Sequence, residues 1–170
     1  GEFYAIDASD PEPRNQGGLT TEDIETGAFG GGFGDQPRRL EIVYSEIAYM
    51  VTSSGRLASI WVDGPSALAA AGEQSLVNPA NDLAFTGFLT DNTTYAKELL
   101  IVSSTSNGGR YQFLDVGNLG DPQVVGTPIG SAVAEPQAIA VEGGYLYAFE
   151  DSVAGDENRF VIYEIIIDGP

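Results

Sequence analysis

The stretch that decides the fold is Glu135–Ala148, which reads EPQAIAVEGGYLYA. A proline leads a short apolar run, Glu142–Gly144 interrupts it, and a second apolar run follows at once. Glycine accepts the positive φ that tight hairpin turns require, so the pattern predicts two antiparallel strands joined by a turn. Similar runs, broken by Gly, Pro, Asn, Asp and Ser, fill the rest of the chain, and long helical periodicity is missing. The sequence therefore predicts an all-β fold.

This arrangement of strands occurs three times along the chain. Each copy has a proline-led strand, a strand rich in aromatic and branched residues, and a third strand that ends near an Asp or Gly-Pro turn. The leading prolines Pro37, Pro79 and Pro136 are 42 and 57 residues apart. Four-stranded β-propeller blades recur every ~40 to 50 residues. An insertion around Thr90–Lys97 accounts for the longer interval.

The repeats resemble those of β-propellers with LVIVD-type repeats. The best matches are Leu99–Val102 (LLIV), Leu114–Val116 (LDV) and the Asp121–Pro122 turn. The resemblance implies four-stranded antiparallel blades that stack face to face, so that Leu99–Val102 and Tyr145–Phe149 are buried on both faces. Propellers close with roughly four to eight blades, and this chain supplies about three. We therefore expect an incomplete propeller or a fragment of one.

The predicted organisation has five parts. Within the first full blade, Ser66–Ala71 is expected to form a short helix, because a proline precedes this alanine-rich stretch and Gly72 follows it. The Gly-rich segment is expected to be a loop without strands. The five parts are the end of a preceding blade (1–13), a Gly-rich insertion loop (14–36), two blades (37–78 and 79–135) and a blade lacking its last strand (136–170).

The chain is strongly acidic, with 25 Asp and Glu against 7 Lys and Arg and a net charge of -18. Nucleic acids and anionic lipids bind Lys and Arg clusters, so we exclude both as partners. No apolar run approaches the roughly 20 residues of a membrane-spanning helix, so no membrane insertion is expected. Salt screens the self-repulsion of such a surface, which suits a marine or halophilic source as well as simple solubility. We expect an extracellular or cell-envelope location.

Histidine and cysteine are both absent. Their absence excludes a disulfide framework, a thiolate metal site, and Ser-His or Cys-His catalysis within these residues. The Gly-rich segment has neither the Lys nor the Ser or Thr of a phosphate-binding loop. We therefore predict no catalytic and no cofactor-binding residue.

Two acidic clusters are candidate calcium sites, because calcium takes several carboxylate and carbonyl oxygens. Neither cluster has EF-hand spacing, and solvated loops are the alternative interpretation in so acidic a chain. The second and weaker cluster is Asp115, Asn118 and Asp121. The first follows Glu150 on the last hairpin, and its predicted ligands are Asp151, Asp156, Glu157 and Asn158.

Three hypotheses of function remain. The first is a non-catalytic propeller module of a secreted or cell-envelope acidic protein, which scaffolds or binds a protein or a glycan. The second is a fragment of a calcium-dependent propeller hydrolase, similar to a phosphatase, phytase or lactonase, whose carboxylates need no histidine. The third is a subunit of an extracellular assembly, whose open blade edges pair with neighbouring subunits or with the remainder of the propeller.

Overall fold

The computed structural model of the protein describes residues 3–7, 25–29, 36–62, 68–76, 79–90, 96–105, 110–130, 134–152 and 157–166. The regular secondary structure of these residues consists of strands, without a helix, so the prediction of an all-β fold is confirmed. The pairings among the described strands are all antiparallel. Within each sheet, the strands that pair are consecutive in the sequence. No sheet closes on itself in the described part of the chain.

The N-terminal sheet has four strands: β3 (Pro37–Val43), β4 (Ile47–Thr52), β5 (Arg56–Val62) and β6 (Leu68–Ser75). The prediction of a helix over Ser66–Ala71 is wrong at residues 68–71, which belong to β6, and residues 66 and 67 lie outside the described residues. Residues 68–70 pair with β5. Alanine favours helices by only a few tenths of a kcal/mol per residue over most residues, so sheet pairing and packing override it.

The middle sheet also has four strands: β7 (Asp82–Thr90), β8 (Ala96–Ser104), β9 (Arg110–Asp115) and β10 (Gln123–Ile129). The last sheet has three: β11 (Ala134–Glu142), β12 (Tyr145–Ser152) and β13 (Asn158–Glu164). The predicted turn between β11 and β12 is present, and Gly143 and Gly144 have positive φ of 58° and 84°. Glycine adopts such values at lower cost than residues that have a Cβ atom.

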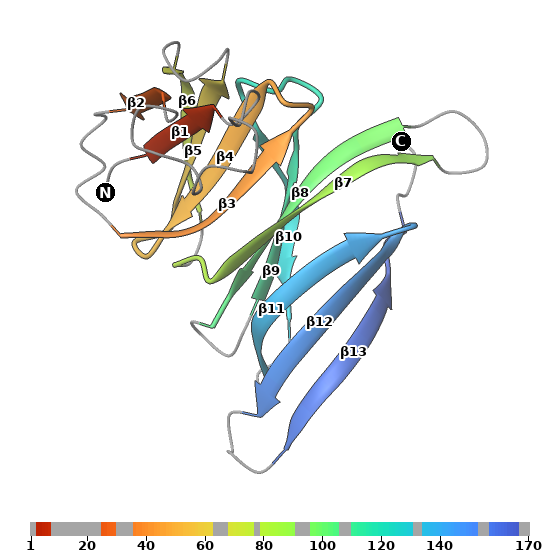
Figure 1. The fold of residues 1–170 in the computed structure, drawn as a ribbon. Coiled ribbons are helices and arrows are strands. Elements are labelled where there is room, and N and C mark those ends of the chain that lie inside the picture. Colours follow the sequence, from red (N-terminus) through yellow and green to blue (C-terminus); the bar gives the residue numbers. More distant parts are fainter. Residues whose placement is uncertain are drawn as a thin grey trace, which may run out of the picture.

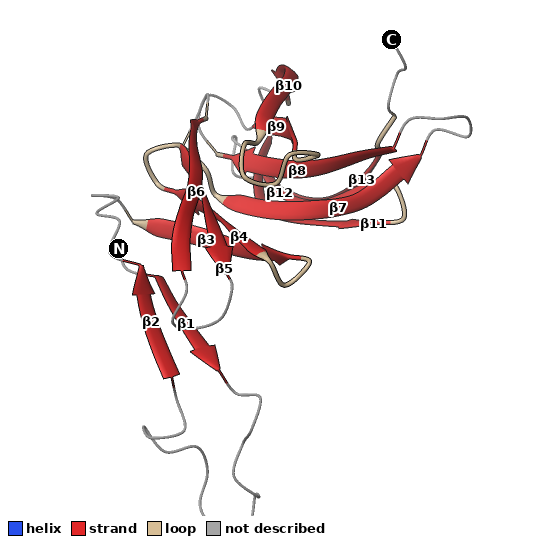
Figure 2. Ribbon diagram, turned by 90° about the horizontal axis from the view of Figure 1, so that it is seen from above, coloured by secondary structure: helices blue, strands red, loops and turns tan. Residues whose placement is uncertain are grey.

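A separate hairpin is formed by β1 (Phe3–Asp7) and β2 (Glu25–Phe29). β2 contacts β6 of the N-terminal sheet, and Figure 2 shows the hairpin beyond one end of β6. The prediction that 14–36 is a loop without strands is therefore wrong at Glu25–Phe29. Glycine weakens a strand pattern in the sequence but does not prevent pairing with a partner strand.

The three larger sheets stack in the order of the chain (Figure 1), with one hydrophobic cluster on each side of the middle sheet. In β8, Leu100 and Val102 pack with the N-terminal sheet and Ile101 packs with the last sheet. Side chains alternate between the two faces of a strand, so β8 is buried on both. The prediction of two-sided burial is confirmed for Leu99–Val102. It is wrong for Tyr145–Phe149, because Tyr145 and Phe149 are exposed.

The first strands of the three sheets, β3, β7 and β11, lie side by side with β7 between the other two. β3 and β11 share a local irregularity. The pairing of each shifts by one residue directly after its leading proline, between Pro37 and Arg39 and between Pro136 and Ala138. This shift is a β-bulge, which bends a strand and re-aims its side chains. The two strands that flank β7 therefore have a bulge at the same position, directly after the leading proline.

Candidate functional site

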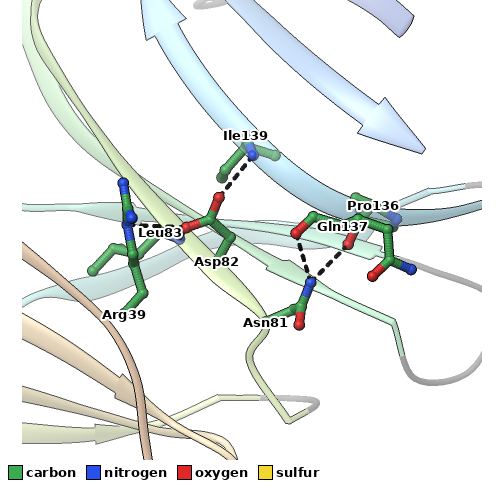
Figure 3. A network of polar contacts seen from close by, with 7 residues as sticks. All are labelled: Arg39, Asn81, Asp82, Leu83, Pro136, Gln137 and Ile139. Carbon is green, nitrogen blue, oxygen red and sulfur yellow. Dashed lines mark hydrogen bonds and ion pairs between the residues drawn. The ribbon is translucent and has the colours of Figure 1, made fainter. Parts of the chain in front are cut away.

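Asp82, the first residue of β7, connects the three first strands (Figure 3). Its Oδ2 accepts a hydrogen bond of 2.8 Å from the backbone N–H of Ile139 in β11. Its Oδ1 accepts one of 2.9 Å from the N–H of Leu83 and lies 3.2 Å from Nε of Arg39 in β3. The carboxylate therefore joins all three sheets, and its oxygens are already occupied by these donors.

Asn81 reinforces this junction from the preceding position. Its Nδ2 donates to the carbonyl oxygens of Pro136 (3.3 Å) and Gln137 (2.8 Å), at the bulge of β11. Burial raises the pKa of the neighbouring Glu41, the Arg39 charge opposes this, and the Asp82 charge adds to it. The hydrogen bonds and the ion pair of Asp82 and Asn81 therefore hold the sheets together.

Glu150 is the centre of a second polar network, between the middle and last sheets. It is only 2% exposed. Its Oε1 accepts hydrogen bonds from the hydroxyls of Tyr111 (2.6 Å) and Tyr163 (2.9 Å). Its Oε2 accepts from Nε of Arg159 at 2.8 Å and lies 2.7 Å from Nη2 of the same residue. Buried carboxylates are tolerated when they are paired and hydrogen-bonded in this way.

Electrostatics keep Glu150 ionised. Burial alone raises its pKa, but hydrogen bonds from Tyr111, Arg159 and Tyr163, together with the Arg159 charge, outweigh burial and lower the pKa below 4.5. Burial, and then the hydrogen bond to Glu150, raises the pKa of Tyr111 well above its ordinary value of 10.0. The network is therefore a fixed carboxylate with protonated donors, an arrangement that favours a structural role over acid–base exchange.

The predicted calcium ligands are only partly brought together. Asp151 lies opposite Asn158 across β12 and β13, Glu157 is exposed, and Asp156 lies outside the described residues. Among the residues that the structure describes, no group of three or more His, Cys, Asp or Glu side chains could hold a metal ion. The calcium site therefore stays a prediction. Glu150 of the same acidic run points into the network described above.

The second acidic cluster shapes the turn between β9 and β10. Oδ1 of Asp115 accepts a hydrogen bond of 2.9 Å from the N–H of Gly117. The N–H of Asp121 donates to the carbonyl of Asn118 at 3.0 Å. The first of these bonds is made by a side chain, which is why Asp is common in turns, and the second joins backbone groups.

The last sheet turns one apolar face to solvent, which we name the open face. Cross-strand partners share a face of a sheet, so the register of β11, β12 and β13 arranges it in three rows. Phe149, Phe160 and Ile162 are 43%, 65% and 54% exposed, and Tyr147 and Phe160 stack with ring centroids 6.2 Å apart. The sequence predicted these strands but not their exposure. The rows are Ala138–Phe149–Phe160, Ala140–Tyr147–Ile162 and Glu142–Tyr145–Glu164.

On the opposite side of the last sheet, a groove of about 850 Å³ separates β13 from the outer part of the middle sheet. The middle sheet contributes Tyr111, Phe113 and Val125, and the last sheet contributes Tyr163 and Ile165. We name this the β13 groove. Its lining is mainly apolar, which is typical of surfaces that bind another molecule.

No protein-family model, curated protein or solved structure matches the chain. The described residues contain no helix that is long and apolar enough to span a bilayer.

Proposed function

We propose that the chain is a non-catalytic, propeller-type module of an acidic extracellular or cell-envelope protein, and that it scaffolds an assembly by pairing the open face with that of a second copy. The observation that carries the proposal is the uncovered apolar surface of the last sheet. The side-by-side first strands and the stacking of sheets in chain order support the propeller-type arrangement.

The open face continues an interface that already exists twice in the molecule. At the contact with the last sheet, the middle sheet contributes the small residue Ala84 from its first strand, Ile101 from its second and Tyr111 from its third. The open face likewise has a small residue on its first strand, Ala140, and larger residues on its second and third strands, Tyr147 and Ile162. A surface of this composition is suited to another β-sheet, because sheets pack through interdigitating side chains.

The open face is also complementary to itself. A two-fold axis along β12 would place β13 of one copy over β11 of the other. The large side chains Phe160 and Ile162 would then lie over the small side chains Ala138 and Ala140. Alternation of large and small residues across facing positions is how sheet layers interdigitate, and a two-fold contact uses one surface twice.

The chemistry of the face favours a protein over a glycan. Aromatic rings stack on sugars, but glycan sites also need polar side chains that fix the hydroxyl groups. Two of the three rows consist of Ala, Phe, Tyr and Ile. The carboxylates Glu142 and Glu164 lie in the third row. On the first two rows the hydroxyl groups of a glycan would find few hydrogen-bonding partners.

Sedimentation velocity over a range of protein concentrations, at low salt and at ~1 M NaCl, tests the proposal, since salt shortens the Debye length to ~3 Å. We expect a dimer that tightens with salt, because each copy carries a charge of -18. Ile162→Glu should weaken the dimer by at least about tenfold, or ~1.4 kcal/mol. The matched control is Ile42→Glu, which should leave it unchanged, since Ile42 has nearly the same exposure (53% against 54%) but lies in the N-terminal sheet.

A charge-pair mixture tests the register of the two copies. Ala140→Lys and Ile162→Glu should each dimerise at least about tenfold more weakly than the wild type when alone. When mixed they should form a heterodimer, because the axis places residue 140 of one copy against residue 162 of the other. A wild-type protein that is monomeric at both salt concentrations, or a monomer retarded by a polysaccharide gel, overturns the proposal.

A further inference from the structure

The last sheet has fewer strands than the other two. The N-terminal and middle sheets each have four strands, whereas the last sheet has three in the described part of the chain. Its third strand, β13, borders the β13 groove. The groove therefore lies where a fourth strand would extend the last sheet over β9 and β10.

The N-terminal sheet indicates what a fourth strand does at such a place. Its β6 packs so closely on the middle sheet that a Cβ on Gly72 would overlap the carbonyl oxygen of Gly120. A Cβ on Gly120 would come within 3.2 Å of the Trp61 ring. In the N-terminal sheet the fourth strand thus closes the outer part of the stack, and the β13 groove is the corresponding space between the middle and last sheets.

The backbone of β13 is oriented to accept such a strand. The N–H of Ile165 donates to the carbonyl of Gly144 on the β12 side, at 2.8 Å. Backbone groups alternate in direction along a strand, and the β12–β13 register has no bulge. The N–H and C=O groups of Phe160, Ile162 and Glu164 therefore point away from β12, toward the outer edge.

From this geometry we infer that the β13 groove binds an extended segment of another polypeptide, which adds to β13 as an antiparallel strand. Its backbone pairs with the outward groups of Phe160, Ile162 and Glu164. Its alternate apolar side chains fill the groove against Phe113 and Val125. Main-chain bonds give affinity in this mode of recognition, and side-chain pockets give specificity.

Charge restricts the partner. The chain carries a net charge of -18, and Glu164 lies at the edge of the groove. An acidic segment would be repelled, whereas lysine side chains facing solvent would be attracted. The partner is therefore an apolar and basic strand of about seven residues, the length of β13.

The test uses a synthetic peptide of that length, acetylated and amidated, in which valine alternates with lysine and threonine. Fluorescence anisotropy measures its binding to the full chain at low salt. We expect saturable binding, and a loss of at least about tenfold when alternate peptide nitrogens are N-methylated, because the methyl groups block pairing with β13. Amide hydrogen exchange should show slower exchange at Phe160, Ile162 and Glu164 when the peptide is bound.

A matched pair of variants locates the site. Val125→Trp fills the groove and should weaken binding by at least about tenfold, whereas Val124→Trp, on the other face of β10, should leave it unchanged. Sedimentation of both variants separates this inference from the proposed dimer, which uses the opposite face of the last sheet. Equal binding of the N-methylated peptide, equal effects of the two variants, no binding at millimolar peptide, or outward amides already protected in the free protein each overturn the inference.

Discussion

Val51 in β4 and Phe149 in β12 occupy the same position in their respective sheets. Each is paired with the second residue after the leading proline, Pro37 in one sheet and Pro136 in the other. Val51 is fully buried, whereas Phe149 is 43% exposed. The middle sheet covers Val51, and no described residue covers Phe149 to a similar extent. The neighbouring sheet, rather than the local sequence, determines which of two equivalent side chains belongs to the core.

The comparison extends along both strands. All six residues of β4 are buried, while β12 alternates between exposed and buried positions. In β12 the buried positions Leu146, Ala148 and Glu150 face the middle sheet. The two strands thus differ in one face only, which is the open face.

The largest effect should come from placing the same charge at the two equivalent positions. Val51→Lys buries an unpaired ammonium group in the core and should cost at least about 4 kcal/mol of unfolding free energy. Phe149→Lys should cost less than about 1 kcal/mol, because its side chain reaches solvent. Urea unfolding at low salt measures both. Equal losses would mean that the open face is covered in solution.

The next effect concerns the junction at Asp82. Asp82→Ala removes the acceptor for the N–H of Ile139 and should cost about 3 kcal/mol, since a buried donor loses its partner. Arg39→Ala, the control, should cost less than about 1 kcal/mol because the Arg39 side chain is 55% exposed. Urea unfolding compares the two, and hydrogen exchange at Ile139 should accelerate only in Asp82→Ala. A larger loss for Arg39→Ala would show that the ion pair, rather than the backbone acceptor, joins the sheets.

The smallest effect should appear at Glu150, which occupies the position of Thr52 in the N-terminal sheet, because each lies opposite its leading proline. The folded pKa of Glu150 lies below its ordinary value of 4.5. Ionised Glu150 therefore stabilises the folded state above pH 4.5, and this stabilisation is lost as the pH falls through the folded pKa. Glu150→Thr, which copies the N-terminal sheet, should cost about 2 kcal/mol at pH 7 and flatten this acid dependence. Urea unfolding between pH 7 and pH 3 measures it, and an unchanged slope contradicts the assignment.

The strands of the larger sheets were predictable because turns separate them sharply. Glu142–Gly144 is one such turn, and glycine there meets a positive φ. The β6 strand was not predictable, since its alanines favour a helix until β5 supplies hydrogen-bonding partners. The β2 strand was hidden for a similar reason by its glycine-rich surroundings.

The role of Glu150 was missed because it begins an acidic run that suggests solvent or calcium. Alternation gives the missing signal, since Glu150 shares its face with Leu146 and Ala148. Its partner Tyr111 lies 39 residues away in sequence, so no local pattern could identify the contact. The open face was equally hidden, because aromatic strands look alike whether a further sheet covers them or not.

The joining of consecutive strands into each sheet also bears on how such a molecule evolves. Among the described strands none crosses from one sheet into another, so each of these layers corresponds to one continuous stretch of the gene. A tandem duplication of one stretch, or its loss, would lengthen or shorten the stack by a whole layer without rerouting the polypeptide. Homologous chains would then differ in length by steps near the 42 and 57 residues that separate the leading prolines.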